Sequence, residues 1–211
     1  MKTLRAEHVG SGRDQAQWPR PDLPEYAFIG RSNVGKSSLI NMLCGAGKLA
    51  RVSNTPGRTR NVEHFRVFGG NGKAKGCDWY LADLPGYGFA KVSKGERSAW
   101  QSMLRTYLSE RENLQCVFLL IDVRIPPQRN DQDMIQWLGE QGIPFVIVFT
   151  KSDKLSERKV VEHVSRYRIA LKGTWNELPM MMITSATTGR GRDALIEFID
   201  GVNRDSPTAV G

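Results

Sequence analysis

Short apolar runs alternate with amphipathic stretches through most of the 211-residue chain. Residues 117–121 and 145–149 are almost continuously apolar, which is typical of strands buried on both faces of a parallel sheet. Shorter apolar or alternating runs predict further strands at 26–29, 62–68, 79–82 and 180–183. Apolar residues with helical spacing predict helices at 36–43, 98–108, 129–141, 156–171 and 193–202.

This order of elements predicts an α/β fold. Repeated strand–helix units favour a six-stranded, mostly parallel sheet with helices on both faces. The strand at 62–68 runs into a Gly-Gly-Asn-Gly hairpin signal at 69–72, so we expect one antiparallel edge strand. Polarity at both ends leads us to expect a flexible N-terminal tail over 1–22, a single folded domain over 23–202, and a flexible C-terminal tail over 203–211.

Charge narrows the choice of partners only a little. Lysine and arginine outnumber aspartate and glutamate by 30 to 22, which gives a formal net charge of +8. This surplus favours a polyanion, either nucleic acid or an anionic membrane, although plain solubility explains it equally well. No apolar run approaches the ~18–20 residues of a membrane span, and the N-terminus is not a secretory signal. Cys44, Cys77 and Cys116 lack metal-ligand spacing and are interpreted as reduced thiols of a cytosolic protein.

A glycine-rich segment follows the first predicted strand. Residues 30–37 read Gly-Arg-Ser-Asn-Val-Gly-Lys-Ser, which fits the phosphate-binding pattern G-x-x-x-x-G-K-[ST], and a predicted helix follows as the pattern requires. Its glycines let backbone N–H groups and a helix N-terminus face an anion. Lys36 would reach the β- and γ-phosphates, and the hydroxyl of Ser37 would bind Mg²⁺. This pattern alone does not distinguish ATP from GTP.

Two later loops indicate guanine. Residues 150–153 read Thr-Lys-Ser-Asp directly after an apolar strand, which resembles the [NT]-K-x-D motif of GTPases. The carboxylate of Asp153 can accept hydrogen bonds from guanine N1–H and the 2-amino group, and adenine offers neither donor there. The stem of Lys151 would lie along the base. Residues 184–186 follow the last strand and resemble, as a weaker signal, the loop that contacts the guanine carbonyl through backbone N–H groups.

Two segments between these motifs have the features of nucleotide-sensing switches. Asp83 and Gly86 fit D-x-x-G, in which the carboxylate holds Mg²⁺ through water and the glycine N–H senses the γ-phosphate. A simple turn after a strand is the alternative interpretation. Residues 50–61 have no hydrophobic period, which predicts a loop. One hydroxyl there would complete the Mg²⁺ shell, and by spacing alone Thr55 and Thr59 are both candidates.

Together these motifs resemble the EngB family of bacterial GTPases, in the Era/TrmE-like branch. The specific strings are Thr-Pro-Gly-Arg-Thr at 55–59 and Asp-Leu-Pro-Gly-Tyr-Gly at 83–88, and the resemblance spans roughly residues 25–199. It implies the P-loop GTPase fold and Mg²⁺-dependent hydrolysis of GTP. It also implies a role in assembly of the large ribosomal subunit and, through it, in septation and cell division.

The resemblance also implies the roles of individual residues. It assigns the switch hydroxyl to Thr59, a catalytic set of Lys36, Thr59 and Gly86, and Mg²⁺ ligation to Ser37, Thr59 and, through water, Asp83. Asn33 stands where some members of the branch bind K⁺, so K⁺ stimulation through Asn33 is a hypothesis beside a purely structural role in the turn. The expected nucleotide-binding residues are Gly30, Arg31, Ser32, Asn33, Val34, Gly35, Lys36, Ser37, Ser38, Gly57, Arg58, Thr59, Arg60, Asn61, Asp83, Leu84, Pro85, Gly86, Thr150, Lys151, Ser152, Asp153, Thr184, Ser185 and Ala186.

Hydrolysis without a partner should be slow. Tyr87 occupies the place where Ras-like proteins carry the glutamine that orients water, and a phenol cannot act as that amide does. The basic and aromatic segment 87–100 is a candidate for the ribosome contact. We expect a cytoplasmic monomer that binds GTP and GDP, contacts rRNA and ribosomal proteins, and does not bind a membrane.

Three rival interpretations stay open. The first is an adenine-nucleotide protein such as a small kinase or an ATPase. The second is an RNA-binding assembly factor in which hydrolysis is incidental. The third is a membrane-associated GTPase, which is disfavoured because no lipidation signal or amphipathic anchor is evident.

Overall fold

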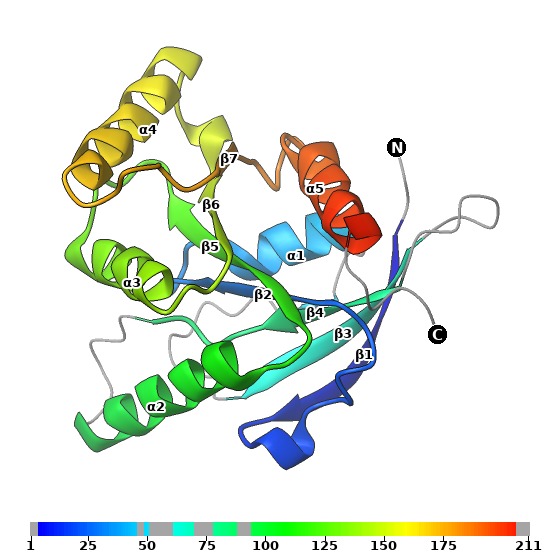
Figure 1. Cartoon of the computed structure of the whole chain (residues 1–211). Coiled ribbons are helices and arrows are strands. Elements are labelled where there is room, and N and C mark those ends of the chain that lie inside the picture. Colours follow the sequence, from blue (N-terminus) through cyan, green and yellow to red (C-terminus); the bar gives the residue numbers. More distant parts are fainter. Residues whose placement is uncertain (1–3, 46–48, 51–60, 70–77, 88–93, 206–211) are drawn as a thin grey trace.

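The computed structural model describes residues 4–45, 49–50, 61–69, 78–87 and 94–205, without the side chains of residues 94, 96 and 97. Its strands are β1 (Arg5–Gly12), β2 (Glu25–Gly30), β3 (Val62–Phe68), β4 (Trp79–Asp83), β5 (Leu114–Asp122), β6 (Phe145–Thr150) and β7 (Met181–Ile183). They form one sheet in the order β1-β3-β4-β2-β5-β6-β7 (Figure 1). The five strands from β4 to β7 in this order are parallel, while β3 runs antiparallel to both of its neighbours. The mostly parallel sheet is therefore confirmed.

The structure corrects the predicted number of strands from six to seven. Arg5–Gly12, which was expected to lie in a flexible tail over 1–22, pairs antiparallel with β3 as strand β1. Most of its side chains are exposed and polar, so it has none of the apolar alternation that predicts a strand. Backbone pairing holds it instead, and so do hydrogen bonds to the carboxylate of Glu63 from His8 Nε2 and Ser11 Oγ, both at 2.8 Å.

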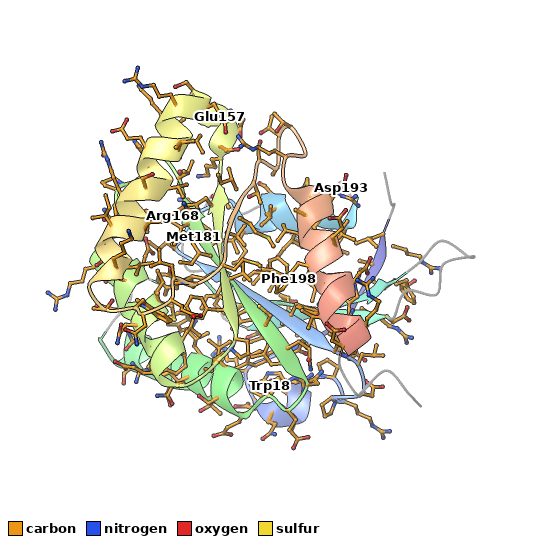
Figure 2. All side chains as sticks on the ribbon, turned by 45° about the horizontal axis from the view of Figure 1, so that its top comes forward. Trp18, Glu157, Arg168, Met181, Asp193 and Phe198 are labelled. Atoms are coloured by element: carbon orange, nitrogen blue, oxygen red, sulfur yellow. The ribbon has the colours of Figure 1, made fainter. Side chains whose placement is uncertain are left out.

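Helices cover both faces of the sheet, as predicted (Figures 1 and 2). Helices α1 (Lys36–Cys44) and α5 (Arg192–Asp205) bury their apolar residues against one face. Helices α2 (Lys94–Glu110), α3 (Arg129–Glu140) and α4 (Glu157–Lys172) pack on the other face. Cys44 and Cys116 are free and buried in the first of these layers, and Cys77 lies outside the described residues.

A buried polar cluster fixes the far end of α2, at the amino end of β2. Glu25 is fully buried, and Arg111 donates to both of its carboxylate oxygens, through Nε at 3.0 Å and NH2 at 2.8 Å. Tyr107 donates its hydroxyl to the same carboxylate and lies 2.9 Å from Nε2 of the fully buried His64. Burial, the positive charge of Arg111 and that of His8 lower the pKa of His64 to about 3, so its imidazole is neutral.

Candidate nucleotide-binding site

Two residues with left-handed backbone angles bend the loop between β2 and α1. Asn33 has a φ of 61°, and Gly35, which directly precedes α1, has a φ of 103°. These angles turn the chain so that α1 begins at Lys36, where the N–H groups of a first helical turn are free to bind an anion. The hydroxyl of Ser32 is buried in the same loop with no hydrogen-bond partner among the described residues. An unpartnered donor of this kind fits a loop that receives phosphate oxygens.

The D-x-x-G loop lies directly against this phosphate loop. The backbone N–H of Tyr87 donates to the carbonyl oxygen of Gly30 at 3.1 Å. A Cβ on Gly86 would come within 2.9 Å of the same oxygen and 3.3 Å of the Ser32 nitrogen. Only glycine lets the two backbones approach this closely. The residue predicted to sense the γ-phosphate is therefore next to the loop predicted to hold it.

Lys36 and Asp83 form a nearly buried ion pair between the two loops. The ammonium of Lys36 donates to Oδ1 of Asp83, and the side chains are 13% and 8% exposed. Burial lowers the pKa of Lys36 to about 7. A buried ammonium needs a nearby anion to remain charged. We therefore expect a bound phosphate to compete with Asp83 for the charge of Lys36.

Ser37 and Asp83 supply the kind of oxygen that Mg²⁺ prefers. Ser37 lies in the first turn of α1, and Asp83 is the last residue of β4. Among the described residues, no group of three or more His, Cys, Asp or Glu side chains could hold a metal by itself. Mg²⁺ usually combines one or two protein ligands with phosphate oxygens and waters, so a hydroxyl and a carboxylate beside a phosphate loop fit it.

The first switch segment lies mostly outside the described residues, including Gly57, Arg58, Thr59 and Arg60. Asn61 is described, and its side-chain amide contacts Oγ of Ser11 and Nε of Arg13, both at 3.0 Å. These contacts tie Asn61 to β1 and the turn after it rather than to the phosphate loop. Leu84, also predicted to bind nucleotide, is fully buried in the core.

The loop after β6 is joined to the phosphate loop by two side chains. Thr150 donates its hydroxyl to the carbonyl oxygen of Val34 at 2.6 Å. Lys151 has a φ of 61°, and its ammonium donates to the carbonyl oxygen of Asn33 at 2.6 Å. A Cβ on Gly35 would lie 3.4 Å from Cε of Lys151, so the lysine stem passes directly over the phosphate loop.

A hydrogen bond between two loops orients the carboxylate predicted to recognise guanine. Ser185, in the loop after β7, donates its hydroxyl to Oδ1 of Asp153 at 2.7 Å. The backbone N–H of Ser152 donates to the carbonyl oxygen of Thr184 at 3.1 Å. The hydroxyl of Ser185 and the ammonium of Lys154 hold the pKa of Asp153 below its usual value. Asp153 is therefore ionised and oriented at neutral pH, as an acceptor for two guanine donors must be.

Sequence reasoning missed two acidic residues close to these loops. Asp122, at the carboxyl end of β5, lies 3.0 Å from the ammonium of Lys151 and accepts hydrogen bonds from the Arg124 guanidinium at 2.9 and 2.7 Å. Its position at the end of a parallel strand was the available signal. Asp131, in the first turn of α3, accepts a hydrogen bond from the hydroxyl of Tyr87 at 2.8 Å. No local pattern connects these two residues.

Several known proteins of similar sequence are named as probable GTP-binding proteins. The family model described as 50S ribosome-binding GTPase matches residues 25–151. The chain is 48% identical over 206 residues to the probable GTP-binding protein EngB of Flavobacterium psychrophilum, with 97% of each chain covered. It is 46% identical over 208 residues to the probable GTP-binding protein EngB of Porphyromonas gingivalis, with 99% of this chain and 100% of the relative covered.

Solved structures show the same fold. A variant of Era from Aquifex aeolicus bound to GDP·AlF4⁻ matches with a TM-score of 0.68 and 24% identity, over 85% of this chain and 56% of that chain. The crystal structure of a probable GTP-binding protein engB matches with a TM-score of 0.59 and 21% identity, over 86% and 99% of the two chains. At these identities the likeness is one of fold, and it confirms the predicted P-loop GTPase architecture.

Proposed function

Since this chain belongs to the EngB family of GTP-binding proteins, we propose that it is a Mg²⁺-dependent switch that assists assembly of the large ribosomal subunit and, through it, normal growth and cell division. GTP hydrolysis itself follows from the family and its GTPase domain. The observation that carries the proposal is the joining of two loops. Lys151 bonds to the phosphate loop while Asp153, two residues later, is oriented by Ser185. The base and the phosphates of one nucleotide would thus be bound by two loops that are joined to each other through Lys151.

Positioning and charge neutralisation do most of the work of phosphoryl transfer. Lys36 and the backbone N–H groups around Gly35 would bind the β- and γ-phosphate oxygens. Gly86 would direct its N–H to the γ-phosphate and so distinguish GTP from GDP. Mg²⁺ held by Ser37 and, through water, by Asp83 would neutralise further phosphate charge when bound, with Thr59 as the proposed third ligand.

The chain offers no amide to orient the attacking water at the usual position. The hydroxyl of Tyr87 is hydrogen-bonded to Asp131. Burial and the charge of Asp131 keep the pKa of Tyr87 well above its usual value, so it cannot serve as a base. These features support slow hydrolysis by the isolated protein and acceleration by a partner.

K⁺ is a further proposed cofactor, through Asn33. The backbone of Asn33 is left-handed, its carbonyl oxygen accepts a hydrogen bond from Lys151, and the residue is exposed. Equal rates of GTP hydrolysis in K⁺ and Na⁺ buffers at matched ionic strength would leave Asn33 with only its role in the turn.

The outer surface of α4 is the described feature that best suits a ribosomal polyanion. The helix carries five basic residues and two acidic ones. The acidic residues are already paired, Glu157 with Arg190 and Glu162 with Arg166. Among the described residues, no ion pair engages the exposed cations Arg158, Lys159, Arg168 and Lys172. Surface cations without an ion pair support binding to rRNA phosphates. When such cations contact the phosphates, the counterions that had surrounded the RNA are released, and this release favours binding.

The proposed setting is the cytoplasm, with the chain acting as a monomer. In the described part of the chain, none of the helices has the length and apolar character needed to cross a membrane. Residues 88–93 of the basic segment at 87–100 lie outside the described residues, so its ribosome contact stays a prediction.

Sedimentation with purified large ribosomal subunits tests the proposal. The protein is loaded with a non-hydrolysable GTP analogue or with GDP, and co-sedimentation is measured across a salt series. Tighter binding in the GTP-analogue state that weakens with salt is the expected result. Equal or absent binding in both states would leave a GTPase and remove the proposed ribosomal role.

A further inference from the structure

Tyr87 is held at both ends. Its backbone N–H donates to the carbonyl oxygen of Gly30 in the phosphate loop at 3.1 Å. Its hydroxyl donates to Oδ1 of Asp131 on α3 at 2.8 Å, and the residue is only 5% exposed. Since Gly86 directly precedes Tyr87, any movement of the Gly86 N–H would have to disturb one of these two anchors.

Asp131 is an unusual residue to bury, at 2% exposure. Its other carboxylate oxygen, Oδ2, accepts a hydrogen bond at 3.4 Å from the hydroxyl of Tyr167 on α4, which is fully buried. Burial raises the pKa of Asp131, and the bond from Tyr87, the charge of Arg31 and the bond from Tyr167 act against that rise. A buried carboxylate is tolerated only where such donors satisfy it. The D-x-x-G loop, the phosphate loop and α4 therefore all act on this one side chain of α3.

Packing alone would not require this arrangement. A phenylalanine would fill the same space against the core without bringing a carboxylate into it. The tyrosine hydroxyl instead fixes the direction of the ring at its far end through the bond to Asp131. The pair acts as a strut between the loop that would sense phosphate and the first turn of α3.

We infer that Tyr87 is a positioning residue: by bonding to Asp131, it holds the N–H of Gly86 where the γ-phosphate is read, and so sets the preference for GTP over GDP. The inference rests on the proposed role of Gly86 as the γ-phosphate sensor. It goes further in assigning a task to the residue that stands in place of the water-orienting glutamine, and in making α3 and α4 part of the sensing unit.

The test is Tyr87→Phe, which keeps the ring and removes the hydroxyl. The dissociation constants of fluorescent GDP and of a fluorescent non-hydrolysable GTP analogue are measured with Mg²⁺ for both proteins. We expect affinity for the GTP analogue to fall roughly tenfold, the effect of losing a hydrogen bond to a charged group, with affinity for GDP nearly unchanged. Tyr167→Phe should give a smaller change in the same direction, since its bond is longer.

Tyr26→Phe is the matched control. Tyr26 is a fully buried tyrosine, and its hydroxyl donates to Oδ1 of Asn203 on α5 at 2.6 Å, on the opposite face of the sheet. The Tyr26→Phe variant should have a lower melting temperature, but the ratio of its dissociation constants for the GTP analogue and for GDP should not change. If Tyr87→Phe also lowers only the melting temperature, or weakens both nucleotides equally, the residue is merely structural and the inference fails.

The same measurements separate this inference from the proposed function. If the wild-type protein did not distinguish the GTP analogue from GDP, both the proposed nucleotide switch and the positioning role of Tyr87 would be overturned. If the wild-type protein distinguished the two nucleotides and Tyr87→Phe had the same ratio of dissociation constants, only the positioning role of Tyr87 would be overturned. Should Tyr87→Phe fail to fold, Asp131→Asn gives a second reading, because it removes the charged acceptor while leaving the tyrosine in place, and it should shift the ratio in the same direction.

Discussion

The ammonium of Lys151 donates a hydrogen bond to the backbone carbonyl oxygen of Asn33 at 2.6 Å, although 118 residues separate them in sequence. The same ammonium lies 3.0 Å from the Oδ2 of Asp122. A residue predicted from sequence to support the guanine base therefore also holds the phosphate loop. A substitution at Lys151 should consequently weaken binding of both the guanine base and the phosphates.

Lys151→Met tests this double role. Methionine preserves most of the apolar stem but loses the bond to Asn33 and leaves Asp122 with Arg124 alone. We expect affinity for GDP and for GTP analogues to fall about tenfold or more, in equal proportion, by calorimetry. Lys159→Met, on the exposed surface of α4, serves as the control and should bind both nucleotides normally. A Lys151→Met protein with unchanged affinity would show that the link has no energetic role.

Asp153→Asn should change the preferred base from guanine to xanthine. Xanthine carries an oxygen where guanine has its 2-amino group, and the asparagine NH₂ can donate to that oxygen. We expect GDP affinity to fall roughly 100-fold and XDP affinity to rise, because guanine would lose a charged acceptor. Competition between GDP and XDP for one fluorescent nucleotide measures both changes. Continued preference for GDP would count against Asp153 as the base-reading residue.

His64 should make folding sensitive to acid. Its folded pKa of about 3 lies below the unfolded value of about 6.5, because burial disfavours the charged imidazole and the positive charges of Arg111 and His8 disfavour it further. The contribution of His64 to the free energy of unfolding is complete above about pH 6.5. It is lost as the pH falls toward 3, because in that range only the unfolded chain takes up the proton. The free energy of unfolding should fall by about 1.4 kcal/mol per pH unit from this group.

His64→Gln provides the comparison. The glutamine amide can still donate to the hydroxyl oxygen of Tyr107 but does not titrate. Urea unfolding at a series of pH values between about 4.5 and 7 should therefore show a shallower loss of stability in the variant. Identical slopes for the two proteins would mean that His64 takes up its proton in the folded state as well.

The cations of α4 should contribute to the salt dependence of ribosome binding. Replacing Arg158, Arg168 and Lys172 by alanine should reduce the slope of log affinity against log salt by about 2, if each cation meets one phosphate. Three exposed cations elsewhere, Arg20, Arg105 and Arg204, also form no ion pair among the described residues and give a matched triple-alanine control. A slope that falls equally in both triple variants would assign the effect to net charge alone and leave α4 without a specific contact.

Much of the fold could be predicted because its strands carry their own signals. The alternation at residues 62–68 predicts a strand, and β3 has those same bounds, with its buried and less buried residues alternating along most of its length. Strand β1 carried no such signal, since its side chains are mainly polar and its stability comes from pairing with β3. Pairing between residues 50 or more positions apart cannot be predicted from local hydrophobic spacing.

The candidate site divides in the same way. Motifs that are contiguous in the chain, such as the loop ending at Lys36 and the one containing Asp153, could be predicted because their chemistry requires particular residues at fixed spacing. The bond from Tyr87 to Asp131 joins residues 44 positions apart, and it exists only because the sheet brings the D-x-x-G loop to the start of α3. Asp131 looked like an ordinary polar residue of an amphipathic helix, yet it is buried.

Strand β1 also covers the edge of β3 and so prevents the sheets of two molecules from pairing there. Its residues pair along the whole of β3, from Arg5 opposite Phe68 to Gly12 opposite Val62. Without them, the outer N–H and C=O groups of β3 would be open to a strand from another molecule. The charged side chains of β1 and its irregularity between His8 and Gly10 make it a poor template in its own turn. Trimming residues 1–12 would therefore expose an adhesive edge, and copies of the shortened chain would tend to join through their sheets.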